Sequence, residues 1–213
     1  HGGGYYISEM MNRLGQEVVI KNGLRVTDAE TLEITRMVLL GQVQPLVTTK
    51  FLAEGFHALG LSAGSDQLIL GELINEEELG YVGKVTEVNQ ELLDVLLAKN
   101  HIPVIAPLGI TACGQWLNIN ADEVACKVAA ALQAEELYLL TDVPGIKKQG
   151  TWLDKVPIAE VDQLVAEKVV TGGMLPKLNS AKSALLSGVR SVFINNTINS
   201  CGTQLFVEEC LKA

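Results

Sequence analysis

Apolar residues along the chain recur at helical spacing in several segments, and these segments alternate with short, nearly continuous apolar runs. In residues 5–15 the spacing is i, i+3, i+4 and i+7, at Ile7, Met10, Met11 and Leu14. This pattern predicts an amphipathic helix that starts directly after the glycine-rich turn "HGGG" at residues 1–4 and stops at Gly15.

Further segments with helical spacing are predicted at residues 27–41, 91–100, 121–134, 158–170 and 171–189. Thr27 and Glu30 stand at capping-box spacing, which predicts that the first of these helices has Thr27 as its cap. Buried parallel strands are predicted from the apolar runs at residues 101–109, 136–145 and 191–197. Strand, loop and helix in succession predict an α/β fold, a three-layer sandwich around a mainly parallel central sheet. In such sheets ligands bind at the loops that follow the strands.

The composition narrows the class of protein. A chain of 213 residues, of which 48% are hydrophobic, can bury a sizeable core as one large domain or two closely joined lobes. The net charge is −9 and the 16 basic residues are scattered, so we do not expect nucleic-acid binding. No apolar run reaches the roughly 18–20 residues of a membrane-spanning helix, so we do not expect membrane binding either.

The cysteines and histidines do not stand at the spacings of a metal site. The cysteines form no CxxC pair, and the histidines make no HxxH or HExxH pattern. We therefore expect no protein-bound metal. Dispersed thiols are typical of a reducing compartment, so the expected location is the cytoplasm, with the cysteines reduced and partly buried.

Two loops carry residues suited to binding an anion. The turn "HGGG" lets backbone N–H groups approach an anion closely, although a triple glycine is also common in tight turns. Arg25 has an apolar neighbour on each side. Its guanidinium fits a carboxylate, and a surface ion pair is the alternative interpretation.

Polar residues also gather before a predicted helix and after a predicted strand. Asn118, Asn120 and Asp122 precede the helix at residues 121–134, and one of them is expected to cap it, which leaves the others for binding. Asp142 ends a strand before a Pro-Gly turn, a pattern that is ordinary on its own. The sequence contains neither GxxxxGK[ST] nor GxGxxG, which excludes P-loop and Rossmann phosphate binding.

The segment "TGGMLPKL" at residues 171–178 has the pattern of a helix start with a lysine beside the proline. A lysine is unfavourable there by ~0.3–1 kcal/mol, because the N-terminus of a helix is itself positive. Two interpretations of Lys177 stay open: the side chain extends into water, or it acts with the glycines and the helix end on an anionic ligand.

The motifs together resemble those of one family. "HGGG", "NGLRVTD", "GYVG", "NINAD", "LLTDVPGI" and "TGGMLPK", in this order and at these separations, resemble the N-acetylglutamate kinases of the amino-acid kinase family over essentially the whole chain. "NGLRVT" with "NINAD" is the most particular combination. The resemblance implies phosphoryl transfer from ATP, with Mg²⁺, to the side-chain carboxylate of N-acetyl-L-glutamate, giving the acyl phosphate used in arginine biosynthesis.

The resemblance also implies roles for residues at matching positions. Gly3 and Gly4 resemble backbone donors that contact the substrate and the transferring phosphoryl group. Arg25 is similar to the arginine that holds the substrate's α-carboxylate, with Asn118 beside it, and Asn120 is expected to line the same pocket.

On the catalytic and nucleotide side, Asp122 resembles the aspartate that orients catalytic lysines. Lys177 resembles the lysine that stabilises charge as the phosphoryl group moves. The implied ATP-binding positions are Asp142, Val143, Pro144, Gly145, Ile146, Lys147, Val169, Val170, Thr171, Gly173 and Lys177. We accordingly expect a substrate lobe at residues 1–134 and a nucleotide lobe at residues 135–213.

Two features depart from the family pattern. In family members a strand with a lysine and two glycines, a helix and a second strand precede "HGGG", so we expect such a segment ahead of His1 in the intact protein. The loop "LSAGSDQLI" lacks the glycine that family members have directly after "LS" and their Asp-Gly pair, so a rearranged substrate-side loop is expected.

Two alternatives to this function stay open. One is a sibling kinase acting on another carboxylate, such as an aminoadipate derivative or aspartate, which "NGLRVT" disfavours. The other is a catalytically inactive, ligand-binding relative that regulates or assembles with a partner. The expected assembly is a homodimer, and the residues do not indicate a regulatory signalling protein.

Overall fold

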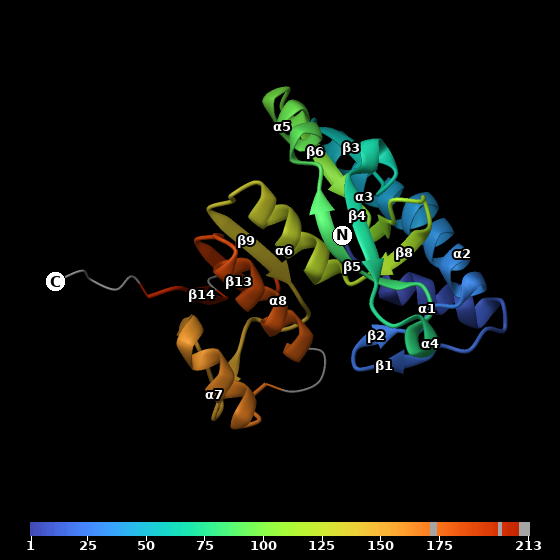
Figure 1. The fold of residues 1–213 in the computed structure, drawn as a ribbon. Helices are drawn as coiled ribbons and strands as arrows, with labels where there is room; N and C mark the ends of the chain where they lie inside the picture. The colour runs from blue at the N-terminus through green and yellow to red at the C-terminus, as the bar shows by residue number, and fades with distance from the viewer. Residues whose placement is uncertain (171–173, 200–201, 209–213) are drawn as a thin grey trace. The chain divides into compact units, whose positions relative to one another are not determined.

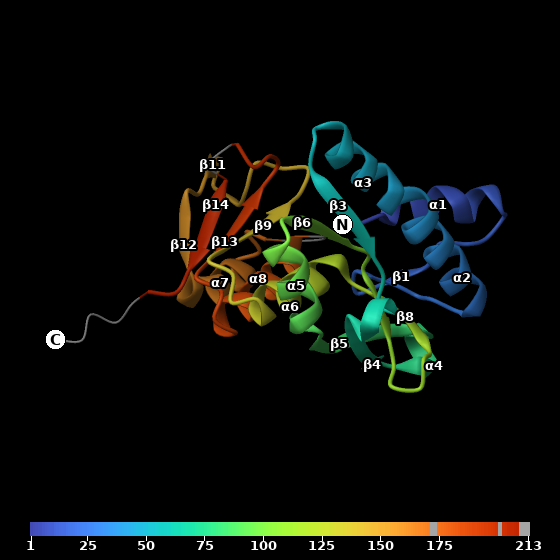
Figure 2. The same ribbon diagram turned by 90° about the horizontal axis from the view of Figure 1, so that it is seen from above.

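The computed structural model describes residues 1–170, 174–199 and 202–208. Its contacts divide the chain into two compact units, residues 1–124 and 125–213 (Figures 1 and 2). The division lies inside helix α6 (Ala121–Ala131). The predicted substrate and nucleotide lobes, with their boundary after Ala134, are defined by the ligands that they bind. The assignment of a ligand to each lobe stays a prediction.

The N-terminal unit is built from short helices and strands. Its helices are α1 (Gly4–Arg13), α2 (Ala29–Val38), the π-helical turn η1 (Leu39–Val43), α3 (Gln44–Ala53), the 3-10 turn η2 (Ser65–Gln67), α4 (Glu76–Leu79) and α5 (Gln90–Ala98). Its strands are β1 (Ile20–Lys21), β2 (Leu24–Arg25), β3 (His57–Leu61), β4 (Ile69–Leu73), β5 (Val82–Val88), β6 (His101–Ile105), β7 (Leu108–Ile110) and β8 (Trp116–Ile119).

The strands of this unit form three groups. β1 and β2 make an antiparallel hairpin, and β3 pairs in parallel with β6. β4, β5, β8 and β7 close into a small barrel. Two glycines permit this closure around Leu117 and Ile119, because a Cβ on Gly83 would lie 2.7 Å from Leu117 Cδ1 and one on Gly109 2.5 Å from Ile119 Cδ1.

The ends of the first two helices confirm one prediction and correct another. α1 ends at Arg13 and is followed by Gly15 with φ of +74°, close to the predicted stop. The cap of α2 is Asp28, whose carboxylate accepts the Thr31 N–H at 2.8 Å. The prediction of Thr27 as the cap was wrong by one residue, because the Thr27 side chain is fully buried and bonds elsewhere.

The helix predicted at residues 27–41 continues much further than expected. α2 passes into the π-helical turn η1 and then directly into α3, so the backbone is helical from Ala29 to Ala53. Pro45 is the second residue of α3 and has no N–H to donate to the preceding turn. The wider π turn ends just before this proline, which accommodates it without ending the helix.

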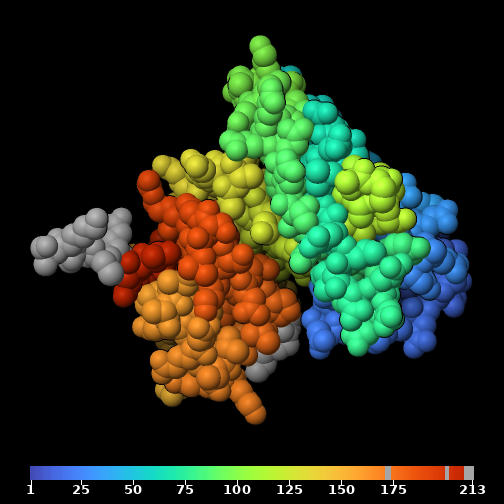
Figure 3. All heavy atoms as spheres, viewed as in Figure 1, coloured from blue at the N-terminus to red at the C-terminus, as the bar shows by residue number. Residues whose placement is uncertain are grey.

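Helix α5 packs on β6 and presents its other side to solvent. Leu93 is buried, whereas Val95 and Leu97 are 56% and 43% exposed. Figure 3 shows the atoms of α5 in green at the surface. Within the described ranges, no helix combines the length and the apolar character that a membrane crossing requires.

The C-terminal unit holds a four-stranded sheet and a small hairpin. Its strands are β9 (Glu136–Leu140), β10 (Lys147–Lys148), β11 (Thr151–Trp152), β12 (Lys155–Pro157), β13 (Ser191–Asn195) and β14 (Thr203–Phe206). Its helices are η3 (Ile158–Glu160), α7 (Val161–Ala166) and α8 (Met174–Leu186). The sheet order is β12-β14-β13-β9, with β9 parallel to β13, β13 antiparallel to β14, and β14 parallel to β12.

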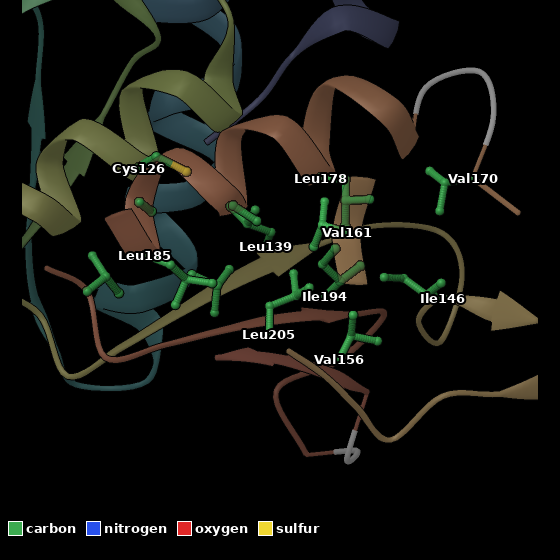
Figure 4. Packing of buried hydrophobic residues seen from close by; sticks show 14 of the residues in the cluster. Cys126, Leu139, Ile146, Val156, Val161, Val170, Leu178, Leu185, Ile194 and Leu205 are labelled. Atoms are coloured by element: carbon green, nitrogen blue, oxygen red, sulfur yellow. The ribbon is translucent and has the colours of Figure 1, made fainter. Parts of the chain in front are cut away.

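A cluster of buried apolar residues joins this sheet to α7 and α8 (Figure 4). Leu139, Ile194 and Leu205 come from the strands, and Leu178 comes from α8. The parallel pairs β3–β6, β9–β13 and β12–β14, alternating with helices, confirm the predicted α/β class. The barrel, which is partly antiparallel, was not predicted.

Candidate active site

A pocket of about 300 Å³ in the N-terminal unit brings together the residues predicted to bind the substrate. Gly3, Gly4, Arg25, Asn118 and Asn120 all line it. The remaining lining residues are Gly2, Ile7, Ile20, Gly23, Leu24, Leu39, Val82, Pro107, Ile119 and Ala121. Segments that lie far apart in the sequence therefore meet at one site.

Arg25 supplies the charge among the lining residues. It ends β2, and its guanidinium lies on α1, where Nη2 donates to Ser8 Oγ at 2.8 Å and to the Gly4 carbonyl at 3.1 Å, and Nη1 donates to Met11 Sδ at 3.3 Å. Partial burial lowers the pKa of Arg25, but a guanidinium remains charged at neutral pH.

The partners of this guanidinium are uncharged. In residues 1–170, 174–199 and 202–208 no carboxylate forms an ion pair with Arg25, so the structure does not support the surface ion pair considered as an alternative. An arginine held against a helix by neutral groups keeps its positive charge for a ligand. Its planar set of N–H donors matches a carboxylate.

The N-terminus of α1 lies at one edge of the pocket. Gly3 is the N-cap, Gly4 is the first helical residue, and the first turn contains no acidic side chain. The N–H groups of this turn have no partners within the helix, and the helix dipole is positive at this end. A negatively charged group of a ligand is therefore stabilised at Gly3 and Gly4.

The polar residues around β8 have different tasks. Asn118 Nδ2 donates to Thr27 Oγ1 at 3.0 Å. Asn120 Oδ1 accepts the N–H groups of Asp122 at 2.9 Å and Glu123 at 3.2 Å, which makes it the cap of α6. The prediction that one of the three polar residues caps this helix is thus confirmed, and Asn120 lines the pocket as well. Asp122 lies half-buried in the first turn of α6, next to the pocket residue Ala121.

Aliphatic side chains form the rest of the pocket wall. Ile7, Leu39 and Val82 are at most 5% exposed, and Ile20 and Leu24 come from the β1–β2 hairpin. Such a wall favours a ligand with an apolar part beside its charged groups. A charged guanidinium, a helix N-terminus, two amides and an apolar wall suit a small ligand with negative charges and an apolar part.

The predicted nucleotide-binding residues lie in the C-terminal unit. Residues 141–146 follow the carboxyl end of β9, the expected place for a ligand in a parallel sheet. Asp142 and Pro144 are exposed, and Val143 is half-buried. The Asp142 carboxylate accepts from Thr141 Oγ1 at 3.0 Å. Lys147 Nζ lies 5.1 Å from the centre of the Trp152 ring, a cation-π contact.

Other predicted nucleotide-binding residues belong to the core of this unit. Gly145 is buried, and Ile146 and Val170 are 2% and 5% exposed, at the same end of the buried cluster (Figure 4). The backbone N–H and carbonyl of Ile146 bond to Thr203 Oγ1 and to the Leu153 N–H. Val169 packs against the same cluster. Thr171 and Gly173, which are also predicted to bind ATP, lie outside the described residues.

Lys177 is the fourth residue of α8, and its side chain is only 9% exposed. The first turn of this helix contains no acidic residue. A lysine that extends freely into water is therefore not what the structure shows. A buried ammonium exerts a stronger electrostatic effect on a nearby anion than an exposed one, because less water screens it.

Sequence reasoning did not identify several residues that line the pocket or hold its arginine. Ser8 and Met11 hold the Arg25 guanidinium, and Leu39 forms part of the wall. Ser8 directly follows Ile7, which belongs to the predicted apolar stripe. A polar side chain next to this stripe was the sequence signal that could have identified Ser8. Thr27, which bonds to Asn118, was interpreted only as a helix cap.

The fold and the pocket define an α/β protein with a binding site for a small anionic ligand. Residues 1–196 match the family model described as the amino acid kinase family, and the chain belongs to this family. The chain is 50% identical over 205 residues to an acetylglutamate kinase of Listeria monocytogenes serotype 4b, an alignment that covers 96% of this chain and 82% of the relative.

Solved structures show the same fold. The smu.665 protein of Streptococcus mutans matches with a TM-score of 0.93 at 33% identity, covering 98% of this chain and 84% of that one. Carbamate kinase from Giardia lamblia bound to AMP-PNP matches with a TM-score of 0.70 at 14% identity, covering 97% and 81%. At that identity the likeness concerns the fold alone. The predicted amino-acid kinase fold of the carbamate kinase type is confirmed.

Proposed function

We propose that this protein is an acetylglutamate kinase. It transfers a phosphoryl group from ATP to the side-chain carboxylate of N-acetyl-L-glutamate, giving N-acetyl-L-glutamyl 5-phosphate for arginine biosynthesis. The 50% identity to an acetylglutamate kinase over 96% of the chain supports this activity. The structural observation that carries it is Arg25, whose guanidinium lines a pocket beside the N-terminus of α1 and has uncharged partners.

The proposed substrate lies across the pocket of the N-terminal unit. Arg25, with Asn118 beside it, holds the α-carboxylate, and Asn120 contacts the other polar groups of the ligand. The aliphatic wall contacts the methyl group and the carbon chain. The side-chain carboxylate then lies at the N–H groups of Gly3 and Gly4, where the phosphoryl group is transferred.

The proposed reaction needs positioning and charge neutralisation more than covalent catalysis. A carboxylate oxygen of the substrate attacks the γ-phosphorus while the bond to the bridging oxygen breaks, and the electron pair of that bond leaves with ADP. Gly3 donates an N–H to the migrating group, and Lys177 stabilises its negative charge. Asp122 has the catalytic role that the family resemblance implies.

Kinase chemistry uses ATP as the phosphoryl donor, and we place the nucleotide at the C-terminal unit. Its proposed contacts are Asp142, Val143, Pro144, Gly145, Ile146, Lys147, Val169, Val170, Thr171, Gly173 and Lys177. Among the described residues no group of three His, Cys, Asp or Glu side chains could hold a metal ion. We propose that Mg²⁺ is held mainly by the nucleotide's phosphates and by water rather than by a protein cage. Residues 1–134 would then form the substrate lobe and residues 135–213 the nucleotide lobe.

The proposed assembly is a homodimer in the cytoplasm, with small-molecule ligands and without nucleic-acid or membrane partners. Large apolar side chains gather on α3, β3 and the loop between them; Leu46, Phe51, Leu52, Phe56 and Leu59 are 37–53% exposed. A second copy covering this surface would bury them. Light scattering on Leu52→Glu, with the exposed α5 variant Leu97→Glu as the control, checks this. A monomeric Leu52→Glu beside a dimeric control supports the dimer, and a monomeric wild type contradicts it.

The activity is tested on the purified intact protein with ATP, Mg²⁺ and a panel of carboxylates. We expect ADP release and a hydroxylamine-trapped acyl phosphate with N-acetyl-L-glutamate, and much lower kcat/KM with aspartate or an aminoadipate derivative. A preference for one of those substrates would identify a sibling kinase. Nucleotide binding without turnover on any of them would identify an inactive relative.

A further inference from the structure

Thr27 lies between the two residues proposed to hold the substrate's α-carboxylate. It is fully buried, with 0% of its surface exposed, although it directly precedes the exposed cap Asp28. Buried hydroxyl groups in proteins are nearly always hydrogen-bonded. The hydroxyl of Thr27 makes its bonds to Arg25 and Asn118.

The hydrogen bonds of this hydroxyl fix how Asn118 is oriented. Thr27 Oγ1 lies 2.6 Å from the carbonyl oxygen of Arg25, which can only accept, so the single hydroxyl proton is donated there. Asn118 lies 3.0 Å from the same hydroxyl and must therefore present its NH₂ group as the donor. The carbonyl oxygen and the second N–H of the Asn118 amide are left for a ligand.

The backbone of Thr27 is anchored to the segment between α4 and β5. Its N–H donates to the Leu79 carbonyl at 2.8 Å, and its carbonyl accepts the Tyr81 N–H at 2.7 Å. The residue between them is Gly80, with φ of +67°, and a Cβ there would clash with the Thr27 carbonyl oxygen. Tyr81 in turn accepts the backbone N–H of Asn118 at 2.9 Å. Thr27 and Asn118 are thus joined through both backbone and side chain.

We infer that Thr27 is a positioning residue for substrate binding: its hydroxyl holds the backbone of Arg25 and the amide of Asn118 in one fixed arrangement. The inference rests on the proposed function, because Arg25 and Asn118 are the proposed ligands of the α-carboxylate. Thr27 does not line the pocket, and it acts on the substrate through these two residues. Without the hydroxyl, the Arg25 carbonyl and the Asn118 N–H, both on half-buried residues, lose their partner, and both side chains gain freedom.

The first test compares Thr27→Val, which keeps the shape but removes the hydroxyl, with Thr27→Ser, which keeps the hydroxyl. We expect Thr27→Val to raise the KM for N-acetyl-L-glutamate on the order of 10- to 100-fold and the KM for ATP less than about threefold. Thr27→Ser should stay within about threefold of wild type in both constants. A role in stability alone would lower Tm and leave the KM for N-acetyl-L-glutamate unchanged, and that result overturns the inference.

A double-mutant cycle asks whether Thr27 acts through Asn118. In an Asn118→Ala background the amide that Thr27 orients is gone, so Thr27→Val should raise KM by clearly less than it does in the wild-type background. Effects that simply multiply would show that the two residues act independently. That outcome also contradicts the inference.

A readout that needs no turnover separates this inference from the proposed activity. In ¹⁵N–¹H spectra the side-chain amide signal of Asn118 is identified by its loss in Asn118→Ala. We expect this pair to shift in Thr27→Val and to stay close to wild type in Thr27→Ser. An unchanged signal in Thr27→Val overturns the hydrogen bond. A shifted signal in a protein without activity toward N-acetyl-L-glutamate refutes the proposed function but supports the positioning of Asn118.

Discussion

Gly3 and Leu39 approach so closely that no side chain fits between them. A Cβ on Gly3 would lie 2.5 Å from Leu39 Cδ2 and 3.4 Å from Val43 Cγ2. Leu39 and Val43 are the first and last residues of the π-helical turn η1. The π turn therefore packs directly against the glycine loop at the N-terminus of α1. Single π turns are frequent at functional sites, and here the turn fixes the position of the proposed phosphoryl-binding N–H groups.

Gly3→Ala tests this contact. The added methyl group forces the loop or Leu39 to move, and a displacement of about 1 Å in a catalytic group costs on the order of 100-fold in rate. We expect kcat to fall by about that factor with a smaller loss of thermal stability. Steady-state kinetics with Gly41→Ala as the control checks it, because a Cβ on Gly41 meets nothing within 4 Å. If the double variant Gly3→Ala/Leu39→Ala partly recovers kcat, the loss is due to this contact. A Gly3→Ala enzyme with normal kcat would contradict the prediction.

Arg25→Lys is expected to weaken substrate binding selectively. A lysine keeps the charge but cannot reproduce the planar donors of a guanidinium or its bonds to Ser8 and Gly4. We predict that the KM for N-acetyl-L-glutamate rises on the order of 10- to 100-fold, while the KM for ATP changes little. Arg13→Lys, at the exposed end of α1, is the matched control. Equal changes in the two Michaelis constants would count against Arg25 as a substrate ligand.

Sequence reasoning worked best where a signal is local. The stop of α1 near Gly15, the cap before α6 and the parallel strand β6 follow from short-range rules of helix capping and hydrophobic runs. The same rules did not predict that α2, η1 and α3 join into one helical segment, because a proline at position 45 ordinarily indicates a helix start or end. The barrel was missed because its short strands are interrupted by glycines and resemble loops.

The pocket shows a similar division. Arg25 and Asn118 could be singled out, because an arginine between apolar residues is locally unusual and because Asn118, Asn120 and Asp122 are more polar residues than one helix cap requires. Their partners could not, because the bond from Arg25 to Ser8 spans 17 residues and that from Asn118 to Thr27 spans 91. Contacts of this kind depend on the tertiary fold.

Asp28→Ala is expected to destabilise α2 in a pH-dependent way. The Asp28 carboxylate accepts the Thr31 N–H, and this bond lowers the pKa of Asp28 below its ordinary value. A carboxylate with a lowered pKa contributes stability above its unfolded pKa of about 3.9 and loses it as the pH falls through the folded value.

Asp28→Ala should therefore lower the free energy of unfolding by about 0.5–2 kcal/mol at pH 7. The difference from wild type should shrink near pH 3. Urea unfolding of wild type and Asp28→Ala at both pH values measures it, with Asp28→Asn as the variant that retains a neutral acceptor. A difference that is the same at both pH values would show that the charge of the carboxylate does not matter.

Lys177→Ala is expected to lower kcat with little effect on ATP affinity. Lys177 is only 9% exposed and is the fourth residue of α8, whose first turn contains no acidic residue. If its ammonium neutralises the migrating phosphoryl group, its loss raises the barrier by about 2–4 kcal/mol, the scale of one electrostatic donor. Lys177→Met, which keeps most of the packing volume without the charge, should show the same loss.

The control is Lys182→Ala on the same helix, because the Lys182 ammonium pairs with the Asp162 carboxylate at 2.6 Å. An ion pair this exposed contributes little, so Lys182→Ala should leave kcat unchanged. A near-normal kcat in Lys177→Met, with Tm lowered only in Lys177→Ala, would show that Lys177 serves packing and would remove it from the proposed mechanism.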